Sequence, residues 1–211
     1  MISKRDTGNL GEITVFTGEQ RPDLLLRVEE EDCPLVFLWP LFLDGAATSQ
    51  RYFPKLSELP QLARFQLIAV HTLDGEETIV GNGNSAPFFW TELADIGNDC
   101  KSPRFAKVLR TLPDGGFDTM LARAINQAIA RGGKEVTPGA LTQDQVSDMP
   151  RWTRKDAPNA LSAFSIAVLP AWRGHNVAEM LIKAMKEAAQ EANLAVLVVP
   201  LRPTKKAQFQ E

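Results

Sequence analysis

The stretch SIAVLPAWRGHNVAEMLIKAMKEAA, residues 165–189, places an apolar run of strand length directly before a run with helical periodicity. The apolar residues that recur at the three- and four-residue spacing of one helix face are Val177, Leu181, Ala184, Met185, Ala188 and Ala192. A second strand-like apolar run follows at residues 194–201. A strand, a helix and a buried strand in this order predict a β-α-β unit with two parallel strands.

Arg173 and Gly174 form the corner between the predicted strand and the predicted helix. The first N–H groups of a helix have no partner within it, and the helix dipole places partial positive charge there. A glycine in the turn lets an anion approach these groups, and Ala178 keeps the following turn small. A strand-to-helix turn with one glycine is also an ordinary part of α/β proteins, so an anion site and a plain turn both stay open on these residues. The phosphate motifs GxGxxG and GxxxxGK[ST] are absent.

Two further apolar runs, at residues 65–72 and 78–90, flank a turn that contains Asp74 and Gly75. This order predicts two adjacent antiparallel strands. Gly81 and Gly83 in the second run indicate a bulge or a close approach of the backbone to a neighbour. Together with the β-α-β unit, the hairpin predicts an α+β fold with a mixed sheet flanked by helices.

The remaining segments are less regular. Residues 13–17 predict a short strand, Pro22 opens a short helix, and a longer helix runs from an N-cap at Asp118 or Thr119 to Arg131. Residues 33–44 are strongly apolar but contain two prolines, which favours a buried irregular segment; the lining of a pocket for an acyl chain is the other interpretation. Residues 91–111 predict a loop, with a helix as the other interpretation, and residues 134–159 predict a long surface excursion.

Composition and charge exclude several classes of protein. The net charge of −3 over 211 residues argues against a dedicated nucleic-acid binder, because phosphate neutralisation needs clustered lysine and arginine. No apolar run approaches the ~20 residues of a membrane span, and the N-terminus lacks the apolar centre of a secretory signal, so a cytoplasmic protein with no membrane partner is expected. Two cysteines far apart and two histidines predict neither a disulfide framework nor a metal centre. We expect one domain over residues 1–211, with 1–64 as an N-terminal part and 65–211 as the sheet core.

The corner region resembles the coenzyme A signature of the GNAT N-acetyltransferase superfamily. The family motif is Arg or Gln, two residues, Gly, one residue, then Gly or Ala. Arg173 and Ala178 match its ends, and Asn176 stands where the central Gly is usual. After Gly, asparagine best tolerates left-handed backbone, which would preserve the shape of the loop. The chain also resembles an uncharacterised GNAT subgroup with a PxRPTxK segment after the next strand, here Pro200, Arg202, Pro203, Thr204 and Lys206.

The resemblance implies an acyl-CoA-dependent N-acyltransferase, which transfers an acyl group from acetyl-CoA or another acyl-CoA to a small amine. We expect the acyl group to be acetyl. The resemblance also implies that the pantetheine arm pairs with the main chain of Ile166, Ala167 and Val168. The residues expected to hold the pyrophosphate are Arg173, Gly174, His175, Asn176, Val177 and Ala178.

Groups for proton transfer are scarce. His71, at the end of a predicted strand, and Glu92, after Trp90, are candidates for the base that takes the amine proton. A structural histidine and a surface carboxylate are the alternatives. The family's usual acid is a tyrosine beyond the second parallel strand, but the single tyrosine, Tyr52, lies far upstream. A catalytically silent GNAT-like module for acyl-CoA binding or interaction, and an α/β domain without a cofactor, therefore stay open as alternative functions.

The end of the chain departs from the family pattern. The family continues past the second parallel strand into another helix and two strands, whereas this sequence ends at Glu211. The C-terminal strands of the fold are therefore expected to be missing. A shortened chain and completion of the sheet by a second copy in a homodimer are the two interpretations.

Overall fold

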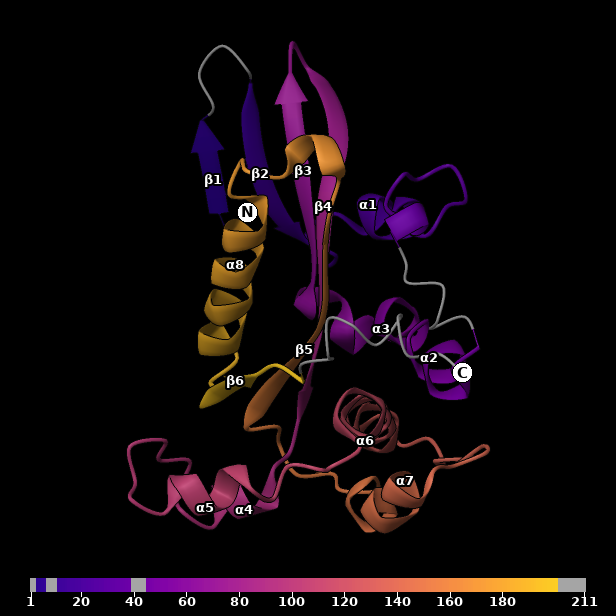
Figure 1. Cartoon of the computed structure of the whole chain (residues 1–211), viewed down its shortest axis with the longest axis vertical. Coiled ribbons are helices and arrows are strands. Elements are labelled where there is room, and N and C mark those ends of the chain that lie inside the picture. The colour runs from indigo at the N-terminus through magenta and orange to yellow at the C-terminus, as the bar shows by residue number, and fades with distance from the viewer. Residues whose placement is uncertain (1–2, 7–10, 39–44, 201–211) are drawn as a thin grey trace. The chain divides into compact units, whose positions relative to one another are not determined.

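The computed structural model describes residues 3–6, 11–38 and 45–200 (Figure 1). Over these residues, six strands form one sheet in the order β1-β2-β3-β4-β5-β6. The strands are β1 (Ser3–Asp6), β2 (Glu12–Thr17), β3 (Gln66–Leu73), β4 (Glu76–Phe88), β5 (Ala160–Val168) and β6 (Val196–Val198). The α-helices are α1 (Pro22–Arg27), α2 (Ala47–Tyr52), α3 (Lys55–Glu58), α4 (Thr91–Ala94), α5 (Phe105–Leu109), α6 (Gly116–Arg131), α7 (Gln143–Asp148) and α8 (Val177–Glu191).

The chain separates into two compact units, each assembled from three segments. The first unit combines Met1–Trp39, Leu56–Ser85 and Ser165–Ala192. The second combines Pro40–Lys55, Ala86–Phe164 and Asn193–Glu211. Strands β4 and β5 contribute residues to both units.

Strands β3 and β4 form the hairpin that the sequence predicts. They run antiparallel from the pair Leu73–Glu76 next to the turn. Asp74 and Gly75 in the turn have φ angles of 51° and 86°, the left-handed values that a two-residue hairpin loop requires. The predicted hairpin is confirmed.

Two glycines of β4 let helix α8 lie directly on the sheet. The register of β3 with β4 shifts by one residue next to Gly81, which is a β-bulge. A Cβ atom on Gly81 would lie 2.9 Å from the carbonyl oxygen of Ala167 and 3.1 Å from a methyl of Val177. A Cβ atom on Gly83 would lie 2.7 Å from the terminal methyl of Met185. The sequence prediction of a bulge or a close approach is confirmed, and both features occur.

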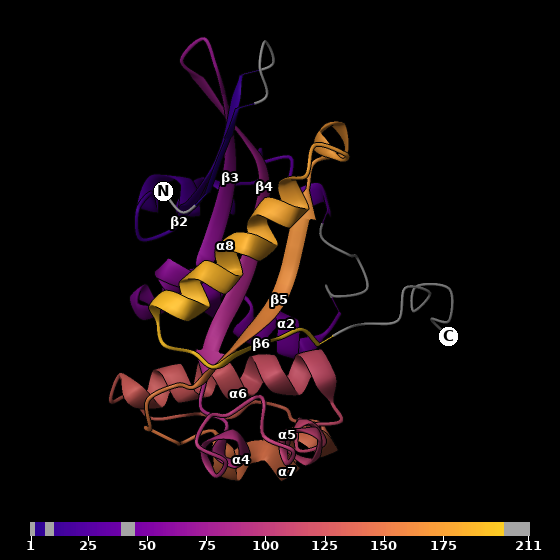
Figure 2. The same cartoon turned by 90° about the vertical axis from the view of Figure 1, so that its left-hand side faces the viewer.

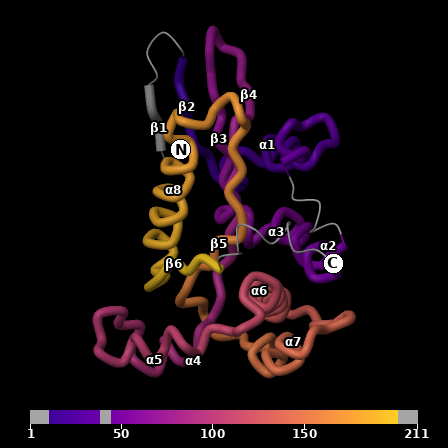
Figure 3. The backbone as a smooth tube through the Cα atoms, in the orientation of Figure 1, coloured from indigo at the N-terminus to yellow at the C-terminus, as the bar shows by residue number. Residues whose placement is uncertain are grey.

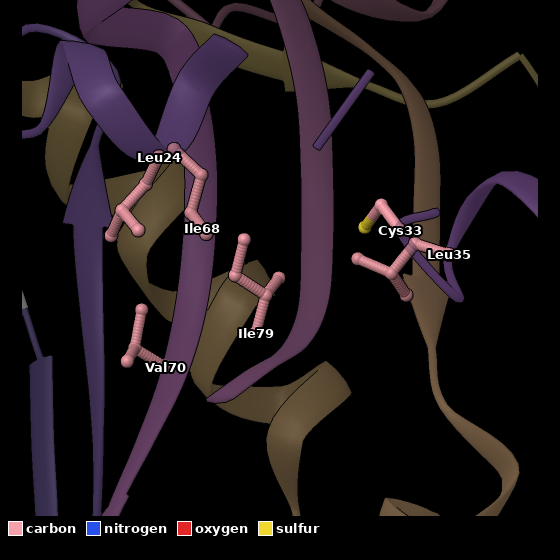
Figure 4. Close-up of a cluster of buried hydrophobic side chains, with 6 residues drawn as sticks. All are labelled: Leu24, Cys33, Leu35, Ile68, Val70 and Ile79. Carbon is pink, nitrogen blue, oxygen red and sulfur yellow. The ribbon is translucent and has the colours of Figure 1, made fainter. Parts of the chain in front are cut away.

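The sheet of the first unit is covered on both faces. Helix α8 crosses the face to which Gly81 and Gly83 belong (Figure 2). The opposite face packs against α1 and the segment after it. The buried cluster on that face consists of Leu24, Cys33, Leu35, Ile68, Val70 and Ile79 (Figure 4). Burial on both faces explains why β3 is apolar without alternation.

The apolar segment at residues 33–44 is buried only in part. Cys33 and Leu35 belong to the core, whereas Phe37, in a 3₁₀ turn at Val36–Leu38, is 78% exposed. Residues 39–44 lie outside the described part of the chain. The prediction of a buried irregular segment is therefore confirmed for Cys33 and Leu35 and wrong for Phe37.

Helix α6 is a long helix of the second unit and begins earlier than the sequence predicts. Its N-cap is Gly115, not Asp118 or Thr119. The N–H of Gly116 closes a turn on the carbonyl of Pro113, so the glycines themselves form the entry to the helix. Asp118 instead lies in the first turn, where its carboxylate faces the positive end of the helix dipole.

The predicted surface excursion at residues 134–159 is wrong for its central part. Helix α7 lies there and begins with a capping box formed by Thr142 and Gln145. Asp148 and Trp152, which follow, are 4% and 1% exposed. The prolines and polar residues of this segment masked a short helix whose inner residues are buried. Residues 91–111 likewise hold two short helices, α4 and α5.

Strands β5 and β6 confirm the predicted β-α-β unit. They pair in parallel, with Ala160, Leu161 and Ser162 opposite Val196, Leu197 and Val198. The pairs β1–β2, β2–β3 and β3–β4 are antiparallel, so the sheet is mixed, as predicted. Strand β6 is shorter than residues 194–201, and Leu201 lies outside the described residues. The α+β prediction is thus confirmed.

The described residues contain neither a helix that could cross a membrane nor a cluster of side chains that could bind a metal ion. None of the helices there has both the length and the apolar character to span a membrane. Within the same residues, no group of three or more histidine, cysteine, aspartate or glutamate side chains is placed to hold a metal ion.

Candidate functional site

The turn between β5 and α8 is a self-supported backbone loop (Figure 3). Leu169 donates its N–H to the carbonyl of Val80 at 3.0 Å, which fixes the end of β5 against β4. A 3₁₀ turn at Pro170–Trp172 follows. Within it, Trp172 donates to the carbonyl of Leu169 at 2.8 Å and Arg173 to that of Pro170 at 3.2 Å. Two of these bonds lie within the loop, and the bond to Val80 ties its start to β4.

Two left-handed residues shape the last part of the loop. Gly174 has a φ of 84°, and a Cβ atom there would meet only open space. Asn176 has a φ of 62° and a ψ of 17°, which is the left-handed conformation expected at the position where the family motif has glycine. The replacement of Gly by Asn therefore leaves a left-handed backbone at this point.

Helix α8 begins with unused donors. Asn176 is its N-cap, and no side chain among the described residues caps this end. The first intrahelical bond runs from the N–H of Met180 to the carbonyl of Asn176 at 3.0 Å. The N–H groups of Val177, Ala178 and Glu179 consequently precede any intrahelical acceptor. Such a set of aligned donors at a helix N-terminus suits a phosphate group.

The side chains around these donors leave them accessible and add positive charge. Arg173, Gly174, Asn176 and Ala178 are all exposed. An exposed cation, Arg173, thus belongs to the loop, and Gly174 adds no side chain to it. The loop fits a pyrophosphate in donor type, charge and access.

The strand residues expected to face a pantetheine arm lie just before this loop. Ile166, Ala167 and Val168 form the last part of β5 and are half-buried. The register of β5 with β6 ends at the pair Ser162–Val198. Within the described residues, these three have no partner in β6.

His71 lies close to the loop, against a residue that the sequence reasoning missed. Its ring centroid is 4.3 Å from that of Trp172, with an angle of 43° between the planes. Trp172 also lies 5.6 Å from the ring of His175. His71 is buried, at 8% exposed. Trp172 belongs to no sequence motif. Its contact with His71 appears only in the folded chain, where β3 lies beside the loop.

Glu92 belongs to the second unit, unlike His71. It lies in the first turn of α4, and its Oε1 accepts a hydrogen bond from Nη2 of Arg151 at 3.0 Å. Its Oε2 is buried and has no hydrogen-bond partner among the described residues. The two candidate bases thus occupy different units, and each has its own supporting aromatic or cationic neighbour.

Tyr52 is a buried side chain of the core of the second unit. It is 3% exposed, and its hydroxyl accepts a hydrogen bond from the amide of Asn126 at 3.3 Å. Its ring also packs edge-on against Trp152. The segment with Arg202, Pro203, Thr204 and Lys206 lies outside the described residues.

Comparison with known proteins supports the resemblance found in the sequence. No protein-family model matches the chain. The arginine N-acetyltransferase avaD of Aspergillus versicolor is 29% identical over 194 residues, which are 91% of this chain and 53% of that protein. The chain therefore spans about half the length of this curated relative. The match confirms the similarity to N-acetyltransferases that Arg173, Asn176 and Ala178 indicate.

One solved structure also aligns with most of the chain. It is AAC(6')-Iy in complex with the bisubstrate analog CoA-S-monomethyl-acetylneamine. The alignment covers 93% of this chain and 84% of that one, with 12% identity and a TM-score of 0.38.

Proposed function

We propose that the protein transfers an acyl group, expected to be acetyl, from acyl-CoA to a small amine. One observation carries the proposal: the turn from β5 into α8 combines two left-handed residues, Gly174 and Asn176, with uncapped helix donors and the exposed Arg173. This combination suits the pyrophosphate of coenzyme A, because it offers several N–H donors and a fixed cation at one point.

Arginine is the first amine to test as the acceptor. The curated relative is an arginine N-acetyltransferase, and it matches nearly the whole of this chain. The chain spans only about half of that relative, so the acceptor of this protein is part of the proposal.

Each part of the chain has a distinct role in the proposed reaction. Bound acyl-CoA supplies the acyl group as an activated thioester. The N–H groups of residues 177–179 and the Arg173 guanidinium hold the pyrophosphate, and the free edge of residues 166–168 aligns the pantetheine arm. Holding both reactants in place supplies most of the rate enhancement in a direct transfer of this kind.

The amine must lose a proton as it attacks the thioester carbonyl. Glu92 is the stronger candidate base, because its Oε1 is fixed by Arg151 while its Oε2 has no donor among the described residues. His71 packs against Trp172 of the loop. That contact suits a role in supporting the loop.

The first experiment measures binding and transfer separately. Calorimetry and thermal unfolding with acetyl-CoA test binding, and ligand at a hundredfold excess over the dissociation constant should stabilise the protein by about 2.7 kcal/mol. Release of free thiol in the presence of arginine, and of a panel of other amines, tests transfer.

Arg173→Ala is the matched variant. Loss of a charge-assisted hydrogen bond should weaken acetyl-CoA affinity by about 10- to 100-fold without lowering stability. Lys183→Ala, on the exposed side of α8, is the control and should leave affinity unchanged. Binding without thiol release would favour the catalytically silent module, and no binding of any acyl-CoA would refute both functions.

A further inference from the structure

Two asparagines of β4 lie on the face of the sheet that points away from α8, within the first unit. Asn82 pairs with Ile68 of β3, and residues that pair directly in an antiparallel sheet share a face. Ile68 belongs to the buried cluster against α1. Gly81 and Gly83, on either side of Asn82, face α8. Both glycines are buried, whereas Asn82 and Asn84 are only half-buried, so solvent reaches β4 from the side of the asparagines.

Asn82 lies next to Ala167 of β5. A Cβ atom on Gly81 would lie 2.9 Å from the carbonyl oxygen of Ala167, and the amide of Asn84 donates to the Ser165 hydroxyl at 2.8 Å. Asn82 lies between these two contacts on β4, and side chains of a strand alternate between faces. Ala167 therefore shares the face of Asn82. It also belongs to the segment expected to align the pantetheine arm.

The side-chain oxygen of Asn82 has no partner. Its Oδ1 is covered and accepts no hydrogen bond from any of the described residues. Such an unpaired acceptor is unfavourable compared with a leucine, which has the same shape. A half-turn of the terminal torsion exchanges the oxygen and the NH2 group, so the oxygen of this half-buried residue can turn toward solvent. A ligand with an N–H donor would supply the missing partner there.

We propose that the Asn82 carboxamide binds the guanidinium of an arginine acceptor. The inference rests on the proposed function and assigns a residue to the far end of the acceptor, which leaves the α-amine as the attacking group. A guanidinium carries only donors, so it matches an unpaired oxygen. It is also more weakly hydrated than an ammonium, which suits a position beside an apolar cluster. One strand, about 5 Å wide, separates Asn82 from the edge expected to align the pantetheine arm, and an arginine side chain can span it.

The test compares arginine with norvaline, which has the same α-amine and carboxylate but lacks the guanidinium. Thiol release from acetyl-CoA should show a higher kcat/KM for arginine in the unaltered protein. Asn82→Leu should lower kcat/KM for arginine by about 10- to 100-fold, mainly through a raised KM, because a hydrogen bond to a charged group is lost. It should leave kcat/KM for norvaline unchanged. An unchanged ratio between the two amino acids, or acetylation of the guanidinium in the product, would overturn the assignment.

Asn84→Leu is the matched control on the same face, because the Asn84 amide already donates to the Ser165 hydroxyl. The control should lower the unfolding midpoint and keep the ratio of arginine to norvaline. Without ligand, Asn82→Leu should instead raise the midpoint by about 2 to 4 °C, because an unpaired polar group is removed. A lowered midpoint in Asn82→Leu would show that the oxygen has a partner within the protein and would overturn the inference.

Failure of the inference and failure of the proposed function give different results. If the unaltered protein acetylates arginine and Asn82→Leu keeps the ratio of arginine to norvaline, the Asn82 assignment alone is wrong. If other amines are acetylated and arginine is not, the assignment falls and acyl transfer stands. If the unaltered protein binds no acyl-CoA, the proposed function falls and the assignment falls with it.

Discussion

Three polar side chains of α6 are buried and hydrogen-bonded, whereas polar groups at the start of α8 are exposed. On α6, the side chains of Arg123, Asn126 and Gln127 are at most 1% exposed, and each has partners within the second unit. At the start of α8, in the first unit, Arg173 and Asn176 are exposed, and the first helix donors precede any intrahelical acceptor. Polar groups that have hydrogen-bond partners within the protein stabilise the fold, whereas polar groups without such partners are available to a ligand.

The network around Arg123 and Gln127 on α6 is densely hydrogen-bonded, whereas Thr119 Oγ1 and Arg131 Nη1 of the same helix are buried without a partner among the described residues. Arg123 donates from Nε and Nη2 to the two carboxylate oxygens of Asp148, at 2.9 and 2.5 Å. Trp152 adds its indole N–H to the same carboxylate at 3.1 Å. Gln127 accepts from the N–H of Phe89 and donates to the carbonyls of Phe89 and Arg151. Such a network leaves little for a ligand to bind.

The largest effect is expected from opening the α6 network. Arg123→Met removes one partner and leaves the Asp148 carboxylate buried, which should lower the free energy of unfolding by about 3 to 5 kcal/mol. Urea unfolding measures this change. The double variant Arg123→Met, Asp148→Leu should recover part of the loss, because no uncompensated charge remains. A single variant as stable as the unaltered protein would remove the basis of the comparison.

The next effect concerns the glycine that seats the start of α8 on the sheet. Gly81→Ala places a methyl 2.9 Å from the Ala167 carbonyl, which is backbone and must shift, so a loss of about 1 to 3 kcal/mol in unfolding free energy is expected. Gly83→Ala is the control, because its methyl meets the flexible end of Met185 and should cost less. Equal losses in chemical denaturation would contradict this account of the seating.

A smaller effect is expected at the left-handed N-cap of α8. Asn176→Val forces a β-branched residue to a φ of 62° and should destabilise the protein by about 1 to 2 kcal/mol. It should also weaken acetyl-CoA binding, because the loop would relax away from this backbone shape. Asn176→Gly accepts the same φ and should keep both stability and affinity, as thermal unfolding and calorimetry can determine. Equal behaviour of the two variants would show that the left-handed backbone is unimportant.

The smallest effect is expected from ion pairs on the surface, which involve neither α6 nor α8. Arg21 donates to Asp23 at 2.8 Å and to Glu77 at 2.9 Å. These bonds lower the pKa of both carboxyl groups. A pKa lower in the folded than in the unfolded state stabilises the protein above about pH 4, and this contribution is lost as the pH falls through the folded pKa.

The variant Arg21→Ala tests this pH dependence. Thermal unfolding at about pH 7 and at about pH 3 should show a smaller loss of stability on acidification than in the unaltered protein. Acetyl-CoA affinity at neutral pH should stay the same, since this ion pair plays no part in the proposed loop. An identical loss on acidification would show that the ion pair is not stabilising.

The sequence predicted the regular parts of the fold because their signals are local. The turn Asp74-Gly75 specifies the hairpin, and the spacing from Val177 onward specifies α8. The prediction for residues 134–159 failed because Asp148 and Trp152 are buried there, with Asp148 bonded to Arg123 of α6 and to Trp152. No local sequence pattern reveals these contacts.

The candidate site was also predicted only in part. The loop from Arg173 to Ala178 is a contiguous motif, and the left-handed shape expected of Asn176 is present. Trp172 and Asn82 were missed, because the contact of one with His71 and the unpaired oxygen of the other exist only in the folded chain.

The central claim is that the start of α8 holds the pyrophosphate of coenzyme A. Amide chemical shifts of ¹⁵N-labelled protein, recorded during titration with coenzyme A, test it most directly. The account predicts large shifts for Gly174, Asn176 and residues 177–179, and none at these amides when pantetheine, which lacks the pyrophosphate, replaces coenzyme A. Binding of coenzyme A that leaves these amides unmoved would contradict the account.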